Sequence, residues 1–502
     1  MPMDYYSSRL KASPGLENLA VDILIQIQKH LDGKDIIVLR KSCKKMHAVT
    51  QRRIVWLNAV RRMCRRHGVF APSFPLEDMS TTELEHASLC PSRLSSLIHN
   101  GVPLRSFVTR ILEPRTPSIV PTVEGNLHCK NAFLIPGGRF LVVNSTHHGI
   151  CLWDLGIHGG KAPRFRPVAV IPELDHSFLC GPTQDGLGII LISWPTSNPS
   201  GSNTSDRTLR AYEIYPCMNS PRFTLLGSIR YPQQDGRVAR SPALYDNLLV
   251  FELHTEDSPD YIVAWNIRLD TAIAWRHDHR GLYDLDDVII YEGGVVVIKM
   301  DELFVWDIPP LRPLFRGIYE VIDQTPRYAI THPFRSQEDF VGSSVLGPWF
   351  ASIDPPISFG ILGSLDPGEK CVMLCYTLRS INPSRDPILP MLFPIKMGMV
   401  PNLPIDTNAD GVDMIDFSGP LRYCDDELCY ISASIHKMFI SLITPPTSLN
   451  GPSSSKSSAL FKMSDPGEFR SWNFCAASGR LVVVDDTTGI IHIMDYLVPP
   501  SS

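Results

Sequence analysis

The spacing of apolar residues divides the chain into two regions of different period. From Leu16 to Trp56 apolar residues recur every three or four positions, as on one face of an α-helix. Gly33 offers the permissive backbone that ends a first helix, Asp35 caps a second, and a basic turn at 42–45 leads to a third. Three short helices bury little surface, so such a unit is usually completed by a partner. The apolar positions of the first helix are Leu19, Ile23, Leu24, Ile27 and Leu31.

Beyond about residue 120, short apolar runs replace the helical spacing, and each is followed by a turn and a second run. The second runs end alike, in a large apolar residue followed by a polar residue and often by another apolar one. Four of these endings begin at Trp153, Tyr212, Trp265 and Trp306, which are 59, 53 and 41 residues apart. The endings read Trp153-Asp154-Leu155, Tyr212-Glu213-Ile214, Trp265-Asn266-Ile267, Trp306-Asp307-Ile308 and Met494-Asp495-Tyr496.

Strand-only repeats of this length predict a β-propeller over residues 120–497, in which each four-stranded blade packs on its neighbours. Two further strand pairs, at 371–378 with 391–395 and at 428–435 with 439–443, bring the expected count to about seven blades. The final strand, at 490–496, is expected to share a blade with an early strand, because a closed ring removes its sheet edges. A pair of β-sandwiches is the alternative, and it fits the recurring endings less well.

Residues 61–119 are predicted to form a helical connector, which follows a flexible N-terminus at 1–15 and the helical unit at 16–60. Ser80 and Glu83 have the spacing of a capping box, and a further helix is expected from Ser92 to the Asn100-Gly101 turn. Two segments rich in Ser and Pro, at 193–206 and 445–458, are predicted to be surface loops, because their composition supports no core. One face of the helix that opens the connector carries Arg61, Arg62, Arg65 and Arg66, opposite Leu57, Val60 and Cys64.

The helical unit resembles the F-box, whose opening Leu-Pro-x-Glu-Ile-Leu reads here Leu19-Ala20-Val21-Asp22-Ile23-Leu24. Ala20 stands where the family has proline, and Asp22 replaces glutamate. The later matches are Leu31-Asp32, Lys34-Asp35-Ile36, Leu39-Arg40, Cys43-Lys44 and Trp56. The resemblance implies docking to the SKP adaptor of cullin-based ubiquitin ligases, whereas a generic three-helix bundle is the alternative. The adaptor-binding residues that it implies are Leu19, Ala20, Ile23, Leu24, Ile27, Leu31, Ile36, Leu39, Cys43 and Trp56.

The strand region resembles WD-repeat propellers, weakly in each repeat. The Gly-His dipeptide that accompanies the Trp-Asp ending in that family is missing from this sequence. A buried hydrogen-bond network built on that histidine is therefore not expected.

The charge is unevenly distributed over the 502 residues. The net charge is −5, but residues 1–70 hold fourteen Lys or Arg against five Asp or Glu, a balance of +9, which leaves −14 for the remainder. An acidic adaptor suits the basic part, whereas nucleic acid is not expected as a partner, because the basic stretch has no interleaved aromatic residues.

No apolar run reaches the roughly 18 residues that span a bilayer, and residues 1–15 have no hydrophobic core of a signal peptide. Cytoplasmic or nuclear localisation is therefore expected, with no membrane partner and with the twelve cysteines as reduced thiols.

No cluster of residues indicates catalysis, so the chain is predicted not to be an enzyme and to need no cofactor or metal. His277 and His279 have no third ligand nearby in the sequence, and neither Cys371/Cys375 nor Cys424/Cys429 has the CxxC spacing of a zinc site. Gly186-Leu187-Gly188 precedes a predicted strand rather than a helix, which excludes a dinucleotide-binding loop.

The expected function is that of a substrate-recognition subunit of an SCF-type ubiquitin ligase. Its N-terminal helices would bind the SKP adaptor and through it a cullin, and its propeller would bind an unidentified protein substrate. The alternatives are a scaffold of the same architecture without a degradative role and a propeller enzyme with metal or carboxylates in its central channel.

Overall fold

Two compact units make up the computed structural model: Met1–Met63, Pro75–Leu89 and Pro499–Ser502 form the first, and Cys64–Phe74 and Cys90–Val498 form the second. The structure describes residues 15–499 with gaps at 102, 113–128, 146–147, 158–165, 175, 196–207, 232–237, 255–259, 278–286, 292, 300–301, 316, 335–339, 346–348, 350–357, 364–370, 381–391, 402, 404–420, 435–436, 447, 463–468 and 486–488. None of the helices in these ranges is both long and apolar enough to cross a bilayer.

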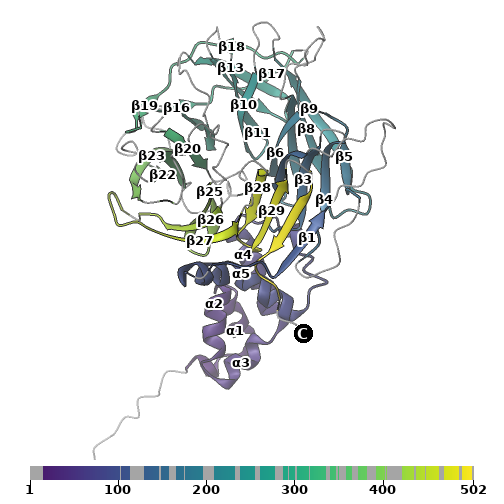
Figure 1. Cartoon of the computed structure of the whole chain (residues 1–502), viewed down its shortest axis with the longest axis vertical. Coiled ribbons are helices and arrows are strands. Elements are labelled where there is room, and N and C mark those ends of the chain that lie inside the picture. Colours follow the sequence, from purple (N-terminus) through teal and green to yellow (C-terminus); the bar gives the residue numbers. More distant parts are fainter. Residues whose placement is uncertain are drawn as a thin grey trace, which may run out of the picture. The chain divides into compact units, whose positions relative to one another are not determined.

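The first unit is helical, as the spacing of its apolar residues predicts (Figure 1). Its elements are η1 (Leu16–Asn18), α1 (Val21–Gln28), α2 (Gly33–Arg40), α3 (Lys44–Thr50), and the parts of α4 (Arg53–Arg66) and α5 (Thr81–His99) that precede Cys64 and Cys90. The prediction for Gly33 was wrong, because Gly33 begins α2 instead of ending α1, and Asp32 rather than Asp35 stands at the N-cap. A Cβ on Gly33 would lie 3.1 Å from the Ser88 carbonyl oxygen, so close packing accounts for this glycine.

Helix α5 replaces the two helices expected between Ser80 and Asn100. The predicted capping box is confirmed, since the Ser80 amide donates to Glu83 Oε2 (2.7 Å) and the Glu83 amide donates to Ser80 Oγ (3.3 Å). The helix continues through Pro91, which lacks an amide donor. Cys90, Leu94 and Ile98 around this proline are buried in one apolar cluster, so tertiary packing outweighs the lost hydrogen bond.

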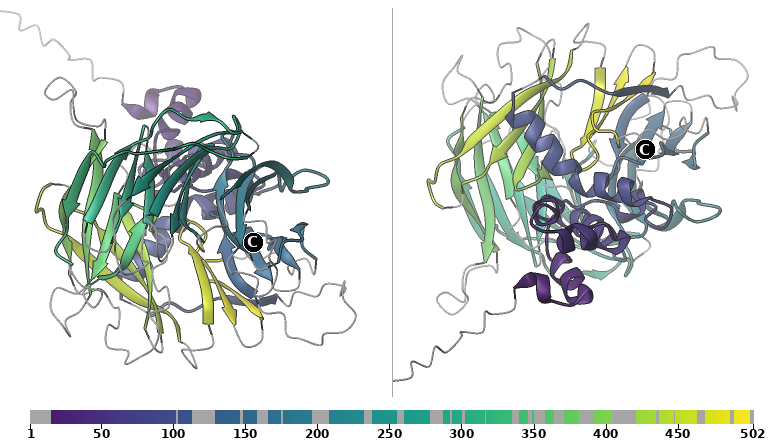
Figure 2. Two further views of the ribbon diagram at one scale, coloured as in Figure 1. Left: turned by 90° about the horizontal axis from the view of Figure 1, so that it is seen from above. Right: turned by 90° about the horizontal axis from the view of Figure 1, so that it is seen from below.

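The second unit contains the predicted all-β propeller, and its described strands form seven blades (Figures 1 and 2). Blade 1 has β2 (Cys129–Leu134), β3 (Phe140–Ser145), β4 (Gly149–Asp154) and β5 (Ala169–Ile171). Blade 2 has β6 (His176–Pro182), β7 (Ile189–Pro195), β8 (Thr208–Ile214) and β9 (Thr224–Arg230). Blade 3 has β10 (Val238–Tyr245), β11 (Leu248–His254), β12 (Asp260–Asn266) and β13 (Thr271–His277), and its outer strand also pairs with β17 (Arg312–Pro313) and β18 (Val321–Ile322).

The remaining blades follow the same order from the innermost strand outward. Blade 4 has β14 (Asp287–Tyr291), β15 (Gly294–Ile298), β16 (Glu302–Asp307) and β19 (Tyr328–Thr331). Blade 5 has β20 (Phe340–Val345), β21 (Ser358–Gly363), β22 (Val372–Ser380) and β23 (Leu392–Val400). Blade 6 has β24 (Arg422–Cys424), β25 (Glu427–Ser434), β26 (Lys437–Thr444) and β27 (Ser454–Lys462). Blade 7 has β28 (Phe469–Cys475), β29 (Arg480–Asp485), β30 (Ile491–Asp495) and β1 (Val108–Leu112).

The ring closes as expected, because β1 pairs antiparallel with β30, with Thr109 opposite Met494. The structure differs in where this early strand lies, since β1 belongs to the range 61–119 that was expected to be helical. Ile111 is exposed and Leu112 is buried, an alternation typical of a strand that covers one face of a sheet.

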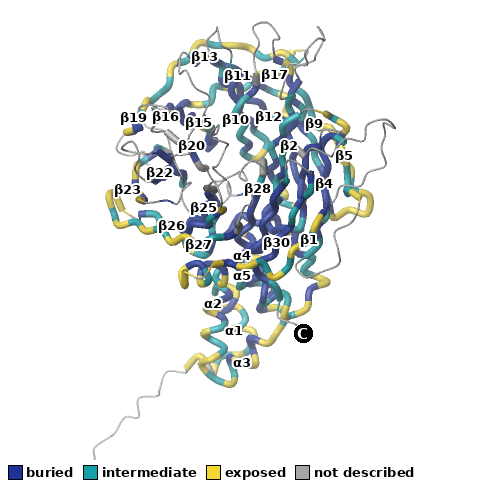
Figure 3. Tube along the Cα trace, in the orientation of Figure 1, coloured by how far each residue is buried: buried dark blue, intermediate teal, exposed yellow. Residues whose placement is uncertain are grey.

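The five recurring endings all lie at the end of the third strand of a blade, on β4, β8, β12, β16 and β30. Apolar residues of neighbouring blades are buried together: one cluster joins Ile190 to Leu249, another Ile298 to Ile361, and a third Met373 to Tyr430. These shared clusters explain why the strands of the ring are largely buried along their length (Figure 3).

The prediction of a loop for the second Ser- and Pro-rich segment is confirmed for its described residues up to Ser453 and is wrong for the last five. Its residues from Ser454 onward form β27, in which Ser458 is buried and Ser457 is exposed. The composition of this segment supports no apolar core, but hydrogen-bond pairing with β26 holds it as the strand β27. The first such segment lies largely outside the described residues.

Candidate functional site

The F-box-like helices pack around a small apolar cluster in the first unit. Leu24, Met46 and Val49 are buried in it. Leu19, Val21, Ile25, Leu39 and Cys43 pack against these three. Cys43 also caps α3, since its Sγ accepts a hydrogen bond from the Met46 amide (3.5 Å). A core of this size is small, in keeping with a unit that a partner completes.

Arg40 connects its own helix, α2, to three other helices of the same unit. Its Nη1 and Nη2 donate to Glu85 Oε1 (3.0 Å) and Oε2 (2.7 Å), which joins α2 to α5. Its Nε donates to Thr50 Oγ1 (3.2 Å), and the guanidinium lies 5.1 Å from the centre of the Trp56 ring. Trp56 Nε1 in turn donates to the Thr50 carbonyl (2.8 Å). The planar fork of arginine makes all of these contacts at once, which a lysine ammonium could not do.

The ten residues implied as adaptor-binding do not share one environment. Those that face solvent are Ala20, Ile23 and Ile27, with Ile23 50% and Ile27 37% exposed. Those that are buried in the unit are Leu24, Ile36 and Trp56. The half-buried residues are Leu19, Leu31, Leu39 and Cys43. An apolar face is therefore left open on α1, whereas the buried residues support it from within.

Three further apolar residues of this unit are exposed, and they were not among the ten. Leu16 is 54%, Val38 is 68% and Ile54 is 43% exposed. Val38 lies in the run Ile36-Ile37-Val38-Leu39. Four consecutive apolar residues on a helix point in four directions, so at least one must face solvent, and this signal was available in the sequence.

The arginines of α4 separate into paired and exposed residues. Arg62 Nε donates to Asp32 Oδ1 (2.9 Å) within the first unit, and Arg66 pairs with Asp426 within the second. Arg61 and Arg65 are exposed. The predicted polar face of this helix is confirmed.

In the second unit, residues 64–74 and 90–104 cover the turns between the first and second strands of several blades. The Phe70 ring meets the edge of Phe140 in blade 1 (6.1 Å between centroids) and of Trp349, between β20 and β21 of blade 5 (5.5 Å). Ser95 Oγ donates to Glu427 Oε2 in blade 6 (3.3 Å). The chain's own residues therefore occupy part of this end of the propeller, which also carries the connections between third and fourth strands. The opposite end carries the connections between second and third strands and those between blades.

Arginine, rather than histidine, holds the polar residue at the end of several third strands. Arg139 Nε and Nη2 donate to Asp154 Oδ1 and Oδ2 (3.0 and 2.9 Å). Arg480 binds Asp495 in the same way (2.5 and 3.1 Å). Both arginines follow a glycine and precede their aspartate by fifteen residues. This spacing can be read from the sequence. The prediction considered only a histidine network and therefore missed the arginine–aspartate pairs.

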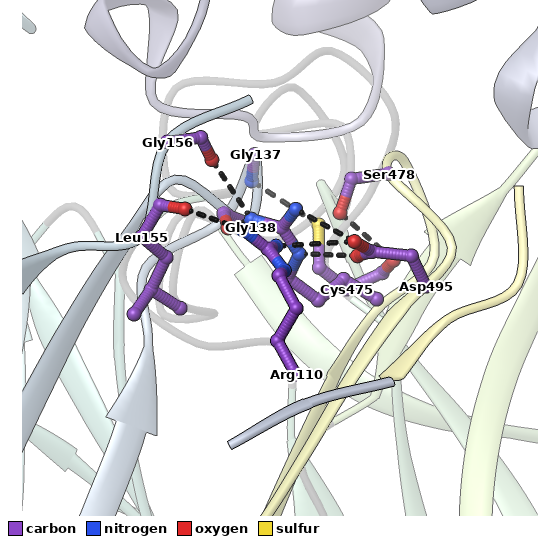
Figure 4. Close-up of polar contacts among 9 residues, drawn as sticks. Arg110, Gly137, Gly138, Leu155, Gly156, Cys475, Ser478 and Asp495 are labelled. Carbon is purple, nitrogen blue, oxygen red and sulfur yellow. Dashed lines mark hydrogen bonds and ion pairs between the residues drawn. The ribbon is translucent and has the colours of Figure 1, made fainter. Parts of the chain in front are cut away.

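The Arg480–Asp495 pair also closes the ring. Arg110 of β1 donates to Asp495 Oδ2 (3.1 Å) and to the Leu155 carbonyl (2.8 Å) (Figure 4). Arg480 donates to the carbonyls of Gly138 and Gly156 in blade 1. Burial and the charge of Arg480 lower the pKa of Arg110, and Asp495 opposes this shift. Asp495 and its two arginines thus join β1 to the rest of blade 7 and join blade 7 to blade 1.

A second buried ionic group lies between blades 3 and 4. Lys299 Nζ donates to Glu252 Oε1 (2.6 Å) and is 4.0 Å from Asp260 Oδ2, and His254 Nδ1 lies 2.9 Å from Asp260 Oδ1. His277 is 2% exposed and meets the edge of the Phe304 ring (4.9 Å), while His279 lies outside the described residues. Among the described residues, no three His, Cys, Asp or Glu side chains are arranged to hold a metal ion.

The cysteine pairs singled out in the sequence are free thiols in the structure. Burial raises the pKa of Cys371, Cys375 and Cys429 to about 12, and it also raises the pKa of Cys424 well above its usual value. Thiols with such pKa values stay protonated at neutral pH and behave as apolar core residues.

A comparison with known protein families confirms the resemblance of the N-terminal helices to the F-box. The family model of the F-box domain matches residues 16–58. A search of curated proteins finds no match. Among solved structures, the β-propeller domain of Cps50 (Swd1) from Myceliophteria thermophila is similar at 9% identity and a TM-score of 0.39, over 77% of this chain and 99% of that one. Residues 16–58 are an F-box domain, and the same chain carries a seven-bladed β-propeller.

Proposed function

We propose that this protein is the substrate-recognition subunit of an SCF-type cullin ubiquitin ligase. F-box domains in general bind the SKP adaptor, and the observation that carries the proposal is the F-box match at residues 16–58 together with the apolar residues that α1 leaves exposed. Ala20, Ile23 and Ile27 form the adaptor-facing surface, and through the adaptor the protein reaches a cullin.

The propeller binds the protein to be ubiquitinated. Residues 64–74 and 90–104 cover part of one end of the ring, which favours the rim and the opposite end as the binding surface. The chain performs no chemistry itself and contributes proximity and orientation to ubiquitin transfer by other subunits. It acts in the cytoplasm or the nucleus, where those subunits work.

The adaptor surface is tested with the double variant Ile23→Asp and Ile27→Asp. Burying each isoleucine in an interface is worth about 1.5–3 kcal/mol, and a buried carboxylate adds a desolvation cost. Adaptor capture by the full-length protein should therefore fall by several orders of magnitude, while thermal unfolding of the propeller, followed by the β-sheet circular dichroism signal, stays unchanged.

A matched control is Leu269→Asp, which alters a 71% exposed leucine of the propeller and should leave adaptor capture intact. Undiminished capture by the Ile23/Ile27 variant would reject the adaptor surface. The half-life of captured propeller partners in cells without this chain then separates a ligase subunit from a scaffold, because only loss of a ligase subunit lengthens it.

A further inference from the structure

Arg422 is a buried cation at the start of β24, the innermost strand of blade 6. Its residue is 6% exposed, and its Nη1 and Nη2 atoms are buried without a hydrogen-bond partner among the described residues. Arg480 offers a comparison within the same ring, since it is also buried and has both a carboxylate and carbonyl oxygens around it. Arg422 is buried without those acceptors.

The surroundings of Arg422 come from three blades. Its guanidinium lies 5.6 Å from the centre of the Phe133 ring on β2, the innermost strand of blade 1. Cys429 of β25 is its cross-strand neighbour, and Cys475 of β28, the innermost strand of blade 7, is near enough to influence its charge. The guanidinium therefore lies where the innermost strands of blades 6, 7 and 1 converge.

The charge of Arg422 is poorly compensated in these surroundings. A cation–π contact contributes about 0.5–2 kcal/mol, whereas an ion enclosed without a counter-charge costs several kcal/mol. Burial lowers the pKa of Arg422. Burial raises the pKa of Cys429 to about 12, so its thiol supplies no negative charge at neutral pH.

We propose that Arg422 holds a small planar monoanion of the carboxylate class at the centre of the propeller. The two Nη groups of a guanidinium match the two oxygens of a carboxylate in a bidentate pair. Phe133 occupies the face of the guanidinium, which leaves its edge for an in-plane ligand. A single negative charge balances the single positive one, whereas a phosphate dianion would leave an excess charge buried. Such an anion acts as a structural ligand of the ring, separately from substrate binding.

Formate is the probe for this site. Thermal unfolding of the full-length protein is followed at constant ionic strength while sodium chloride is replaced stepwise by sodium formate. A ligand that binds only the folded state raises Tm by mass action, so the wild-type Tm should rise by about 2 °C or more and then saturate. Arg422→Met has no charge to compensate, and its Tm should not respond to formate.

Two further variants make the outcome specific. Arg276→Met removes an exposed arginine of β13 and should keep the full response to formate. Arg422→Lys keeps a charge without the fork, and its formate midpoint should move at least tenfold higher; this variant decides if Arg422→Met does not fold. Equal formate dependence in the wild type and the Arg422 variants overturns the proposal. So does a wild-type Tm that does not respond while Arg422→Met lowers it, because a protein group then already balances the charge.

Discussion

The contribution of an ion pair at the end of a strand to stability depends on how deeply the pair is buried. The Asp495 side chain is fully buried between two arginines, whereas the Asp307 side chain, which binds Arg327 at the corresponding place in blade 4, is 51% exposed. Water screens the exposed pair and leaves the buried one to be balanced only by protein groups. The same sequence feature therefore contributes little in one blade and closes the ring in another.

Asp495→Asn tests the buried pair. The change leaves Arg480 and Arg110 without a counter-charge, and removing one partner of a buried ion pair typically costs about 3–5 kcal/mol. Equilibrium unfolding in urea should show a loss of this size in the propeller transition. The control Asp307→Asn should cost less than about 1 kcal/mol. Equal effects of the two changes would show that the Asp495 site is hydrated.

Buried thiols make the second unit sensitive to alkaline pH. Burial raises the pKa of Cys64, Cys90 and Cys429 from 9.0 to about 12. Between pH 9 and 12 the unfolded chain loses protons that the folded chain retains. The contribution of these thiols to stability is therefore fully present below pH 9 and falls as pH rises. Each thiol contributes up to about 1.4 kcal/mol per pH unit.

The free energy of unfolding, measured by urea denaturation between pH 8 and 11, checks this slope. Cys429→Val should make the slope shallower by about one thiol's contribution, relative to the wild type in the same buffers. An unchanged slope would show that Cys429 ionises in the folded protein.

At the scale of elements, turns and helix limits depend on what lies next to them. Gly149 opens β4 at φ +75°, and a Cβ there would lie 2.7 Å from the Glu173 amide nitrogen and closer still to the Ile171 carbonyl oxygen. Gly186, between β6 and β7, has φ +68° but nothing within 4 Å of a Cβ. Both positions favour glycine because the backbone is left-handed. Only at Gly149 would a side chain also clash with neighbouring backbone atoms.

Substitution by alanine separates these two requirements. Gly186→Ala should destabilise the propeller by about 1 kcal/mol, the cost of a left-handed backbone with a Cβ. Gly149→Ala should cost at least about twice as much, because backbone atoms of the neighbouring strand cannot move aside easily. Thermal unfolding of both variants measures the difference. Equal decreases in Tm would mean that residues 171–173 move to accommodate the added Cβ.

At the scale of the whole molecule, the propeller needs residues that precede its first complete blade. β1, Arg110 and the apolar residues Leu94, Ile98 and Leu104 all belong to the second unit. A ring that lacks its closing strand exposes the edge of β30 and part of the core of blade 7.

Two fragments test this requirement. Residues 90–498 should give a cooperative thermal transition with a β-sheet circular dichroism spectrum. Residues 120–498 should aggregate or unfold without a cooperative transition, because they lack β1 and the buried face of α5. A cooperative transition of the shorter fragment at the same temperature would show that β1 contributes little to closure.

The sequence by itself determined the classes of structure in this protein. Helical spacing from Leu19 to Leu31 and strand endings such as Trp153-Asp154-Leu155 are local patterns, and they predicted the F-box helices, the propeller with about seven blades and the closure by an early strand. Composition alone misjudged β27, since a Ser-rich segment becomes a strand only when β26 offers it hydrogen-bond partners.

Only the tertiary structure decided which residues of the F-box face outward and which residues complete the ring. Leu24 and Ile23 are neighbours of similar character in the sequence, yet one is 1% and the other 50% exposed. The continuation of α5 through Pro91, the start of α2 at Gly33 and the three-way contact at Asp495 likewise depend on residues far apart in the chain. The physical reason is that hydrophobic spacing is set by the local geometry of the backbone, whereas burial and charge compensation depend on which distant segments pack together.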